Sequence, residues 1–338
     1  MVPSFAGAFA LAALFAVVVT PLAARLAWVT GWLDQPQARK SHAQATPLLG
    51  GLAVFVSAWL GWLAADALTG RAFARPAPGL LAGAVLALAV GLWDDRFGMG
   101  PRPKLLVQAT CGALLVFSIG APSLGLWPPL EAGLAIFVVI ALMNAINFLD
   151  NMNGMLGGLV LVSLLGFAAV SAGFGASRAV PMQLALAGAC LGFLPWNYPR
   201  ARLFLGDAGS LVLGYSLAAS LLLALQAAPR GWAQLGPPLL VAYPAFDMTF
   251  VVIRRLREGR RIDQGGRDHT NHRLASLIQC PKRTVLLIWC STAALCASGF
   301  ALSRVALPAL ALPVWGLWIT LFLLTGRRLS SVPLAPKA

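Results

Sequence analysis

Long apolar stretches alternate with short polar segments along almost the whole chain. A helix that crosses the roughly 30 Å hydrocarbon layer of a membrane needs about 17 to 25 mainly apolar residues, and eleven stretches reach or approach that length. They cover residues 4–24, 48–68, 78–93, 104–120, 130–149, 155–175, 181–196, 209–228, 236–253, 284–303 and 306–325. The last two could instead form one re-entrant pair. The pattern predicts an all-α, polytopic membrane protein with about eleven transmembrane helices.

The composition supports a membrane protein and excludes several other classes. Of the 338 residues, 59% are hydrophobic and 11% are charged. The mean hydropathy of +0.79 is too high for a chain that folds around one core in water. The five cysteines form no CxxC pair, so neither a cysteine metal site nor a disulfide scaffold is indicated. Soluble enzymes, collagen and coiled coils are excluded as well.

The distribution of positive charge predicts how the chain is oriented. Lysine and arginine number 25 against 11 acids, a formal net charge of +14, which in a soluble domain would suggest a nucleic-acid partner. With the N-terminus outside, 20 of the 25 fall on the cytoplasmic side, as the positive-inside rule requires. We therefore expect the N-terminus outside, the C-terminus in the cytoplasm, and no nucleic-acid partner.

This topology places a single transmembrane catalytic domain at residues 1–326 and a short cytoplasmic tail at 327–338. The cytoplasmic loops are 25–47, 94–103, 149–154, 197–208 and 254–283. No basic residue precedes the first apolar stretch, so we expect it to be retained and not cleaved as a signal peptide.

Acids and histidines gather on the cytoplasmic side too. Nine of the eleven acids lie there, the exceptions being Asp66 and Glu131, and so do His42, His269 and His272. A solitary acid in a loop is usually only solvated, but so many titratable groups on one face indicate a functional site. We expect that site in the cytoplasmic loops.

Asp94 and Asp95 are adjacent at the end of the third apolar stretch. Two neighbouring carboxylates at a membrane surface repel one another unless a metal, a proton or a cationic side chain is shared between them. Solvation by lipid headgroups is an equally good explanation. Lys104 and Gln108 share a face of the next helix. Lys104 could contact a phosphate there, although a lysine that extends its amine to the membrane surface is commoner.

Polar side chains recur along one side of the fifth stretch. Asn144, Asn147 and Asp150 or Asn151 are three or four residues apart, so they form a stripe that must face protein, water or ligand. Hydrogen bonds between helices could explain one or two of the asparagines. Three amides together with a carboxylate favour a ligand site.

Asp207 is flanked by glycines just before the eighth stretch. It could cap that helix. Alternatively, the open backbone would let a metal-bound diphosphate approach, because Mg²⁺ usually takes one or two carboxylates together with phosphate oxygens and water. The chain has no P-loop or GxGxxG sequence, so a nucleotide would be bound in another way.

The largest soluble segment, 254–283, carries nine lysines and arginines. His269 and His272 are three residues apart within it, so on a helix they share a face beside Arg267 and Arg273. Zinc would need further ligands that are not evident nearby, which favours donation to phosphates as charged groups. For the first eight residues of the segment we favour attraction to anionic lipid.

Six motifs occur in order between Asp34 and Leu274. They are Asp34-x-Pro-x-x-Arg39-Lys40-x-His42 with Pro47 and Gly50-Gly51, Asp94-Asp95, Asn147-x-x-Asp150 with Asn153-Gly154, Phe204-Leu205-Gly206-Asp207-x-Gly-Ser, Pro244-x-x-Asp247, and Asp268-His269-x-x-His272-Arg273. Together they resemble the polyprenyl-phosphate N-acetylhexosamine-1-phosphate transferase family. The resemblance implies transfer of a sugar 1-phosphate from a UDP-N-acetylhexosamine to a polyprenyl phosphate such as undecaprenyl phosphate, with release of UMP and a requirement for Mg²⁺ or Mn²⁺.

The resemblance also implies roles for single residues. The catalytic acids would be Asp94, Asp95, Asp150 and Asp207. Asp207 would be the main metal ligand and Asp95 a second one, while Asp94 or Asp95 would engage the lipid phosphate as its base. The substrate-binding residues would be Lys40, His42, Lys104, Asn147, Asn153, His269, His272 and Arg273, of which the last three would hold the phosphates or the sugar of the donor.

Departures from the family pattern concern the donor. Asn151 stands where many members have glycine, Asn153 where many have aspartate, and Asn271 where many have a third histidine. This favours an enzyme of the bacterial inner membrane that initiates lipopolysaccharide, capsule, teichoic acid or a similar glycan. The phospho-MurNAc-pentapeptide transferase of peptidoglycan synthesis is the alternative within the family. A secondary transporter is the alternative from another class, and it would place its acids near the bilayer midplane. We also allow for a homodimer.

Overall fold

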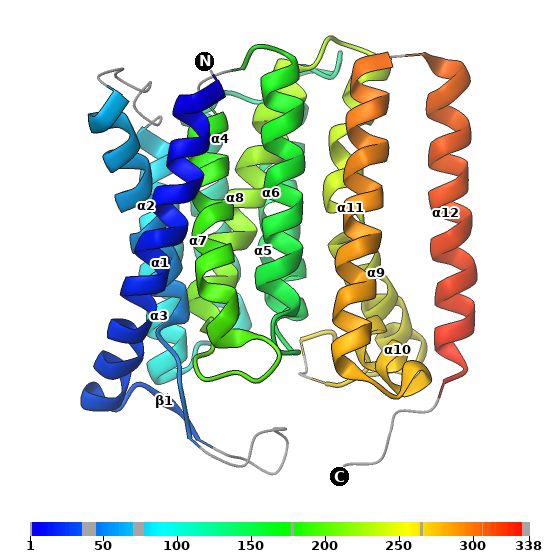
Figure 1. Cartoon of the computed structure of the whole chain (residues 1–338). Helices are drawn as coiled ribbons and strands as arrows, with labels where there is room; N and C mark the ends of the chain where they lie inside the picture. Colours follow the sequence, from blue (N-terminus) through cyan, green and yellow to red (C-terminus); the bar gives the residue numbers. More distant parts are fainter. Residues whose placement is uncertain are drawn as a thin grey trace.

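The computed structural model describes residues 2–35, 45–69, 78–176, 179–263, 266–305 and 307–332, and these are almost entirely helical (Figure 1). The α-helices are α1 (Val2–Thr30), α2 (Gly50–Thr69), α3 (Pro78–Phe97), α4 (Pro101–Ile119), α5 (Pro128–Leu149), α6 (Met155–Gly173), α7 (Val180–Asn197), α8 (Gly206–Ala227), α9 (Ala242–Arg257), α10 (Thr270–Ile278), α11 (Pro281–Val305) and α12 (Pro308–Ser330). Two short 3-10 helices, η1 (Trp232–Leu235) and η2 (Pro237–Val241), precede α9, and β1 (Leu33–Asp34) pairs antiparallel with β2 (Thr46–Pro47). Each predicted stretch overlaps one long helix, and α10 is an additional short one.

Within the described chain, nine helical segments are long and apolar enough to cross a membrane. The prediction of an all-α membrane protein is confirmed. The predicted spans in α3 and α7 are not among these nine, so the number of eleven spans stays a prediction. α11 and α12 are separate helices of 25 and 23 residues, and do not form a re-entrant pair.

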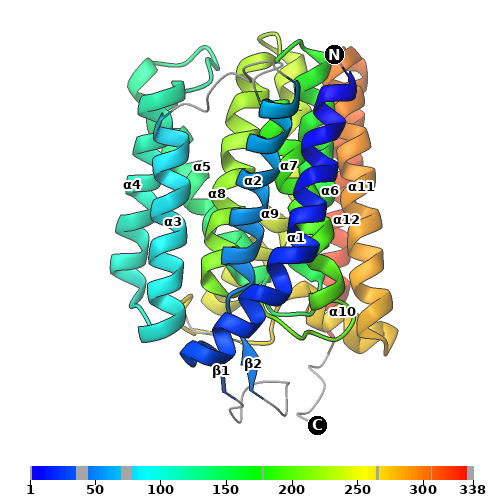
Figure 2. The same ribbon diagram turned by 60° about the vertical axis from the view of Figure 1, so that its left-hand side comes forward.

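The long helices stand side by side with roughly parallel axes (Figures 1 and 2). α1 begins at one end of the bundle, and α12 finishes at the opposite end. α8 contacts α2, α3, α5 and α6. Within the apolar part of each helix, 89% of the residues of α8 are buried inside the protein, against 6% of those of α12. α8 is therefore the central helix against which the others are positioned, whereas α12 lies at the edge.

Small residues let α2 and α3 approach the first turn of α8 very closely. A Cβ atom added at Gly51 would lie 2.1 Å from the main-chain nitrogen of Gly209, and one at Gly91 would lie 2.3 Å from Cα of Ala208. Side chains larger than hydrogen cannot be accommodated at either position. The close contact brings the end of α3, with its two aspartates, to the start of α8, where Asp207 lies.

Gly51→Ala is expected to lower the thermal unfolding midpoint, because the new methyl group would overlap main-chain atoms of α8. Gly133→Ala is a matched control, since a Cβ atom there meets no other atom within 4 Å and alanine favours a helix over glycine by about 1 kcal/mol. Scanning fluorimetry of the detergent-purified protein should give a lower midpoint for the first variant and an unchanged or higher one for the second. Equal midpoints would contradict the close contact.

Candidate active site

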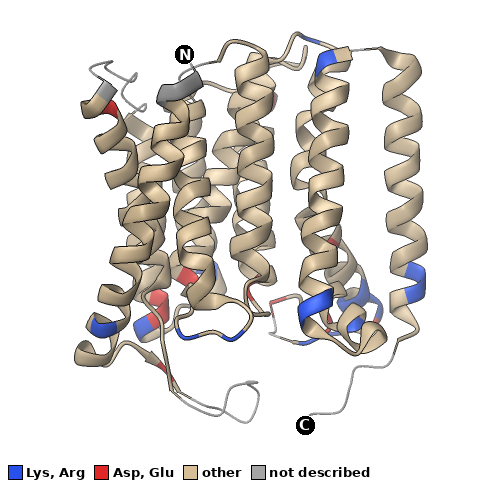
Figure 3. Cartoon of the chain, viewed as in Figure 1, with Lys and Arg blue, Asp and Glu red and all other residues tan. Residues whose placement is uncertain are grey.

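Most charged residues lie at one end of the bundle, the end at which α12 finishes (Figure 3). The clustering of charge on one face follows the sequence prediction. Glu131, at the start of α5, belongs to the opposite end, where its carboxylate accepts hydrogen bonds from the main-chain nitrogens of Leu124 at 2.6 Å and Leu126 at 3.0 Å. Its task is therefore to hold the loop before α5.

Lys104 joins two of the predicted catalytic aspartates. Its amine lies 2.7 Å from Oδ2 of Asp94 and 2.9 Å from Oδ2 of Asp207, so a side chain of α4 bridges α3 and α8. The lysine side chain is only 15% exposed, which shows that it points into the protein and not toward the membrane surface. The repulsion expected among the aspartates is thus offset by an ammonium group.

Asp95 binds the beginning of α8. Its carboxylate accepts hydrogen bonds from the main-chain nitrogens of Asp207 at 2.8 Å and Ala208 at 3.1 Å, two donors that have no partner within the helix. Gly206 has a φ of 70°, and a Cβ atom there would lie 2.5 Å from Oδ2 of Asp95, so both the backbone and the space require glycine. Asp95 therefore positions Asp207, and its predicted role as a metal ligand or base stays a prediction.

The polar stripe of α5 divides between two tasks. Asn144 exchanges side-chain hydrogen bonds of 2.6 and 3.3 Å with Gln108 of α4, which is an interhelical role. Asn147 donates instead to Oδ1 of Asp207 at 2.5 Å and to Oγ of Ser210 at 2.8 Å. Because the other oxygen of Asp207 receives the lysine amine, its carboxylate is held in one orientation.

Asp150 follows α5 directly, and its carboxylate accepts no hydrogen bond from the described residues. Burial, and then the charge of Asp207, raise the pKa of Asp150 to about 7. A cation close to both carboxylates would relieve their repulsion. Among the described residues, none donates a hydrogen bond to the oxygen atoms of Asp150, which leaves them free to bind a ligand.

The chemistry of these aspartates would suit a divalent cation that completes its coordination with other ligands. In the part of the chain that the structure describes, no group of three or more histidine, cysteine, aspartate or glutamate side chains could hold a metal ion. Mg²⁺ needs no such cage, because it commonly takes one or two carboxylates and completes its shell with phosphate oxygens and water. Asp207 and Asp150 are the two carboxylates that suit this arrangement.

A second buried carboxylate holds the histidine segment against α9. Asp247 is fully buried and accepts hydrogen bonds from Nδ1 of His269 at 2.8 Å and from N and Oγ1 of Thr270 at 2.8 and 2.5 Å. A carboxylate at Nδ1 fixes the orientation of the imidazole ring. The sequence indicated Asp247 only as part of a motif, because its partner lies 22 residues further along the chain.

Arg255 and Asp268 form a buried ion pair that fixes the same segment. Nε and Nη2 of Arg255 donate to the carboxylate at 2.9 and 2.8 Å, and Arg260 adds a hydrogen bond of 2.9 Å. Although burial opposes it, hydrogen bonding to Arg255 holds the pKa of Asp268 well below its usual range. The predicted attraction to anionic lipid is therefore wrong for Arg255, whose side chain is 2% exposed.

His272 lines a polar cavity of about 400 Å³ beside α10. The other polar residues of its wall include Asn151, Asn153, Tyr198, Arg267 and Lys282. Burial, followed by the charges of His269 and Arg267, lowers the pKa of His272 to about 4. His272 is therefore neutral at pH 7 and offers hydrogen bonding, whereas the sequence favoured a charged donor.

Three predicted site residues require separate mention. Arg273 is buried, and its guanidinium donates to main-chain carbonyl groups at the end of α12; its predicted contact with the donor stays a prediction. Lys40 and His42 lie outside the described residues, so their roles stay predictions. Ser210 was not predicted, although its position three residues after Asp207 places it on the same helix face.

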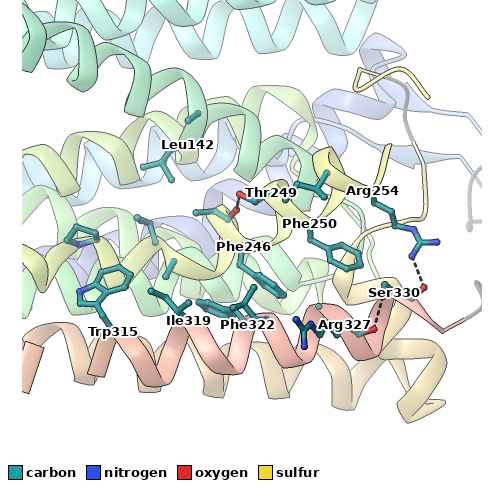
Figure 4. Close-up of a pocket in the computed structure, with 18 of the residues that line it drawn as sticks. Leu142, Phe246, Thr249, Phe250, Arg254, Trp315, Ile319, Phe322, Arg327 and Ser330 are labelled. Carbon is teal, nitrogen blue, oxygen red and sulfur yellow. Dashed lines mark hydrogen bonds between the residues drawn. The ribbon is translucent and has the colours of Figure 1, made fainter. Parts of the chain in front are cut away.

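An apolar groove of about 900 Å³ runs between α5, α9 and α12 (Figure 4). Its walls include Leu142, Phe246, Trp315, Ile319 and Phe322, and Arg254, Arg257 and Arg327 lie toward its charged end. The groove was not predicted, because apolar side chains that line a groove and apolar side chains that face lipid form the same sequence pattern.

Fold and site together define a polytopic membrane protein whose polar groups converge at one end of the bundle. Residues 77–225 match the family described as Glycosyl transferase family 4. A probable undecaprenyl-phosphate N-acetylglucosaminyl 1-phosphate transferase of Bacillus subtilis is 29% identical over 94% of this chain and 87% of its own. A decaprenyl-phosphate N-acetylglucosaminephosphotransferase of Mycolicibacterium smegmatis is 32% identical over 83% of this chain and 78% of its own. The chain belongs to glycosyl transferase family 4 and, within it, to the polyprenyl-phosphate N-acetylhexosamine-1-phosphate transferases, as the motifs predicted.

We expect His272 to make the protein less stable as the pH falls from about 6.5 to 4. Its pKa is lowered to about 4 in the folded chain, so between these values the unfolded chain takes up a proton that the folded chain does not, which favours unfolding by up to about 3 kcal/mol. The unfolding midpoint should therefore drop less between pH 7 and pH 4.5 in His272→Gln than in the wild type. Equal drops would show that burial of this imidazole carries no such penalty.

Proposed function

We propose that this protein transfers an N-acetylhexosamine 1-phosphate from a UDP-sugar to a polyprenyl phosphate, and so initiates a cell-envelope glycan. A phosphate oxygen of the acceptor would attack the donor phosphorus that bears the sugar. The bond from that phosphorus to the bridging oxygen would break, and UMP would leave with this oxygen. The observation that carries the proposal is that Asp207, in the first turn of α8, and the arginines of the groove, in the last turns of α9 and α12, belong to the end of the bundle at which charged residues gather (Figure 3).

The groove is the proposed site of the polyprenyl chain. It is lined mainly by apolar side chains of helices long enough to cross a bilayer, so a polyprenyl chain that enters from the hydrocarbon layer keeps an apolar environment and gains van der Waals contacts with these side chains. Arg254, Arg257 and Arg327 would attract the phosphate at the charged end. An undecaprenyl or decaprenyl carrier agrees with the names of the relatives in Bacillus subtilis and Mycolicibacterium smegmatis.

The polar cavity beside α10 is the proposed site of the donor. Arg267 and Lys282 supply positive charge for a diphosphate, and Asn151, Asn153 and His272 supply hydrogen bonds for a neutral sugar. UDP-N-acetylglucosamine is the favoured donor, because the named relatives act on N-acetylglucosamine. The peptidoglycan transferase and the secondary transporter are not favoured by these relatives.

Asp207 would hold Mg²⁺ or Mn²⁺ together with Asp150. Such an ion offsets the charge that develops on the transferred phosphoryl group. In addition to such an ion, the ammonium group of Lys104 places a positive charge of the protein beside Asp207. Asn147 and Asp95 keep Asp207 in place, and Asp94 orients the lysine amine.

The proposed setting is the bacterial inner membrane, with about eleven spans, the N-terminus outside and the active site on the cytoplasmic face. The gathering of charged side chains at one end of the bundle supports this orientation (Figure 3). UDP-sugars are cytoplasmic metabolites, so the donor would reach the polar cavity directly from that side.

Wild-type membranes supplied with undecaprenyl phosphate and Mg²⁺ should release UMP from UDP-N-acetylglucosamine. A panel that adds UDP-N-acetylgalactosamine and UDP-MurNAc-pentapeptide in the same UMP assay identifies the hexosamine. Release from the pentapeptide donor alone would assign the protein to peptidoglycan synthesis. No UMP from any donor, with substrate flux into vesicles, would instead favour a transporter.

Asp207→Ala should reduce UMP release by at least about 10²-fold, because a charge that acts on the transferred phosphoryl group is lost. Asp263→Ala is the matched control, since this aspartate is an exposed acid in the loop after α9 that pairs only with Arg261 among the described residues. Rates should be compared at equal amounts of protein in the membrane. Full activity of the Asp207 variant would remove the residue from the reaction.

A further inference from the structure

α12 is attached to the rest of the protein at few points. It forms one wall of the apolar groove (Figure 4), and 6% of its most apolar segment is buried. Along the groove, the ring of Phe322 stacks on that of Phe246 with centroids 4.6 Å apart, and the indole nitrogen of Trp315 donates to the carbonyl of Leu235 at 3.0 Å. The position of α12 therefore depends on how its end is held.

Two arginines hold that end. Arg254 of α9 donates to the carbonyl oxygen of Ser330 at 2.7 Å (Figure 4). Arg273 of α10 donates to the carbonyl oxygens of Leu329 at 3.2 Å and Val332 at 2.6 Å. Carbonyl groups in the last turn of a helix lack partners within the helix and carry partial negative charge, so a guanidinium group is well suited to bind them.

The remaining contacts of Arg273 also fix it in this position. Its side chain is 3% exposed, its Nε donates to the carbonyl of Asp268 at 3.3 Å, and its guanidinium lies 5.9 Å from the ring centroid of Phe250. The same short segment carries His272, which lines the polar cavity. One segment thus borders the cavity with one side chain and holds the wall of the groove with another.

We propose that Arg273 is a positioning residue for the lipid acceptor, which fixes the end of α12 and thereby sets the width of the charged end of the groove. This rests on the proposed function, because it takes the groove as the acceptor site. The guanidinium contacts neither substrate. Without it, Arg254 is the one side chain of another helix, among the described residues, that still donates a hydrogen bond to the end of α12. The groove then loses its fixed width, and the acceptor binds more weakly while the donor cavity keeps its polar wall.

Initial rates of UMP release for Arg273→Gln, Arg273→Lys and Arg328→Gln test the proposal. Arg328 is exposed in the last turn of α12, the helix that Arg273 holds, and is the matched control. Loss of hydrogen bonds from a charged group should raise the KM for undecaprenyl phosphate about tenfold in Arg273→Gln, with the KM for UDP-N-acetylglucosamine changed less than about twofold. Lysine keeps the positive charge but lacks the several N–H donors of a guanidinium group, so the KM of Arg273→Lys for undecaprenyl phosphate should lie between those of the wild type and Arg273→Gln. Arg328→Gln should leave both constants unchanged.

Two kinetic outcomes would overturn the proposal. An equal rise in the donor KM would show that Arg273 binds the donor, and unchanged constants in Arg273→Gln would show that α12 is held without it. If wild-type membranes release no UMP from any donor, the proposed function is contradicted instead. The role of Arg273 in holding α12 is then tested by a distance measurement that does not depend on activity.

That measurement is independent of activity. Spin labels at Leu277→Cys in α10 and Ser331→Cys after α12, both exposed positions, are introduced into a chain whose five native cysteines have been replaced. The distance distribution from pulsed electron resonance should broaden in Arg273→Gln and match the wild type in Arg328→Gln. An unchanged distribution in Arg273→Gln would overturn the proposal, even for a variant too unstable for kinetics.

Discussion

The binding of Asp95 to the first turn of α8 is the interaction on which the rest of the site depends. At the edge of an apolar layer, the free N–H groups of a helix start find little water to bind, and Asp95 accepts two of them. The absence of a side chain at Gly91 lets α3 come close enough for this. Because one of the bound N–H groups is that of Asp207, the same contact places its carboxylate, around which Lys104 and Asn147 are then arranged.

The site separates negative from positive charge. Asp94 and Asp207 share a single lysine, and the nearby Asp150 interacts with the charge of Asp207, whereas the cationic Arg267 and Lys282 line the polar cavity beside α10. A phosphate alone would be repelled by the carboxylates and attracted by the cationic wall. A phosphate that brings a divalent cation is attracted by both, which is the physical reason why a metal ion suits this pair of surfaces.

Much of this arrangement could be predicted from the sequence, and the rest depends on which helices face one another. The lengths of the apolar stretches located the helices. Aspartate and glutamate are few, so their positions indicated the site, since a charge inside an apolar chain needs a partner or a function. The same reasoning could not separate Asn144, which binds a neighbouring helix, from Asn147, which binds Asp207, because both lie on one stripe. The sequence also could not show that Arg273 holds α12. The partners of Arg273 are main-chain carbonyl groups 56 and 59 residues further along the chain, and every residue type has such a group, so no sequence pattern marks them.

The groove between α9 and α12 has a consequence for how its occupancy is measured. Both helices belong to segments long and apolar enough to cross a bilayer, so a lipid that binds between them arrives by lateral diffusion within one leaflet. Occupancy then follows the mole fraction of that lipid among its neighbours, and not its amount per volume of solution. Diluting a vesicle suspension leaves this fraction unchanged, whereas adding phospholipid lowers it. The effective concentration of the lipid ligand is therefore its mole fraction in the membrane, whereas that of a water-soluble ligand is its amount per volume of solution.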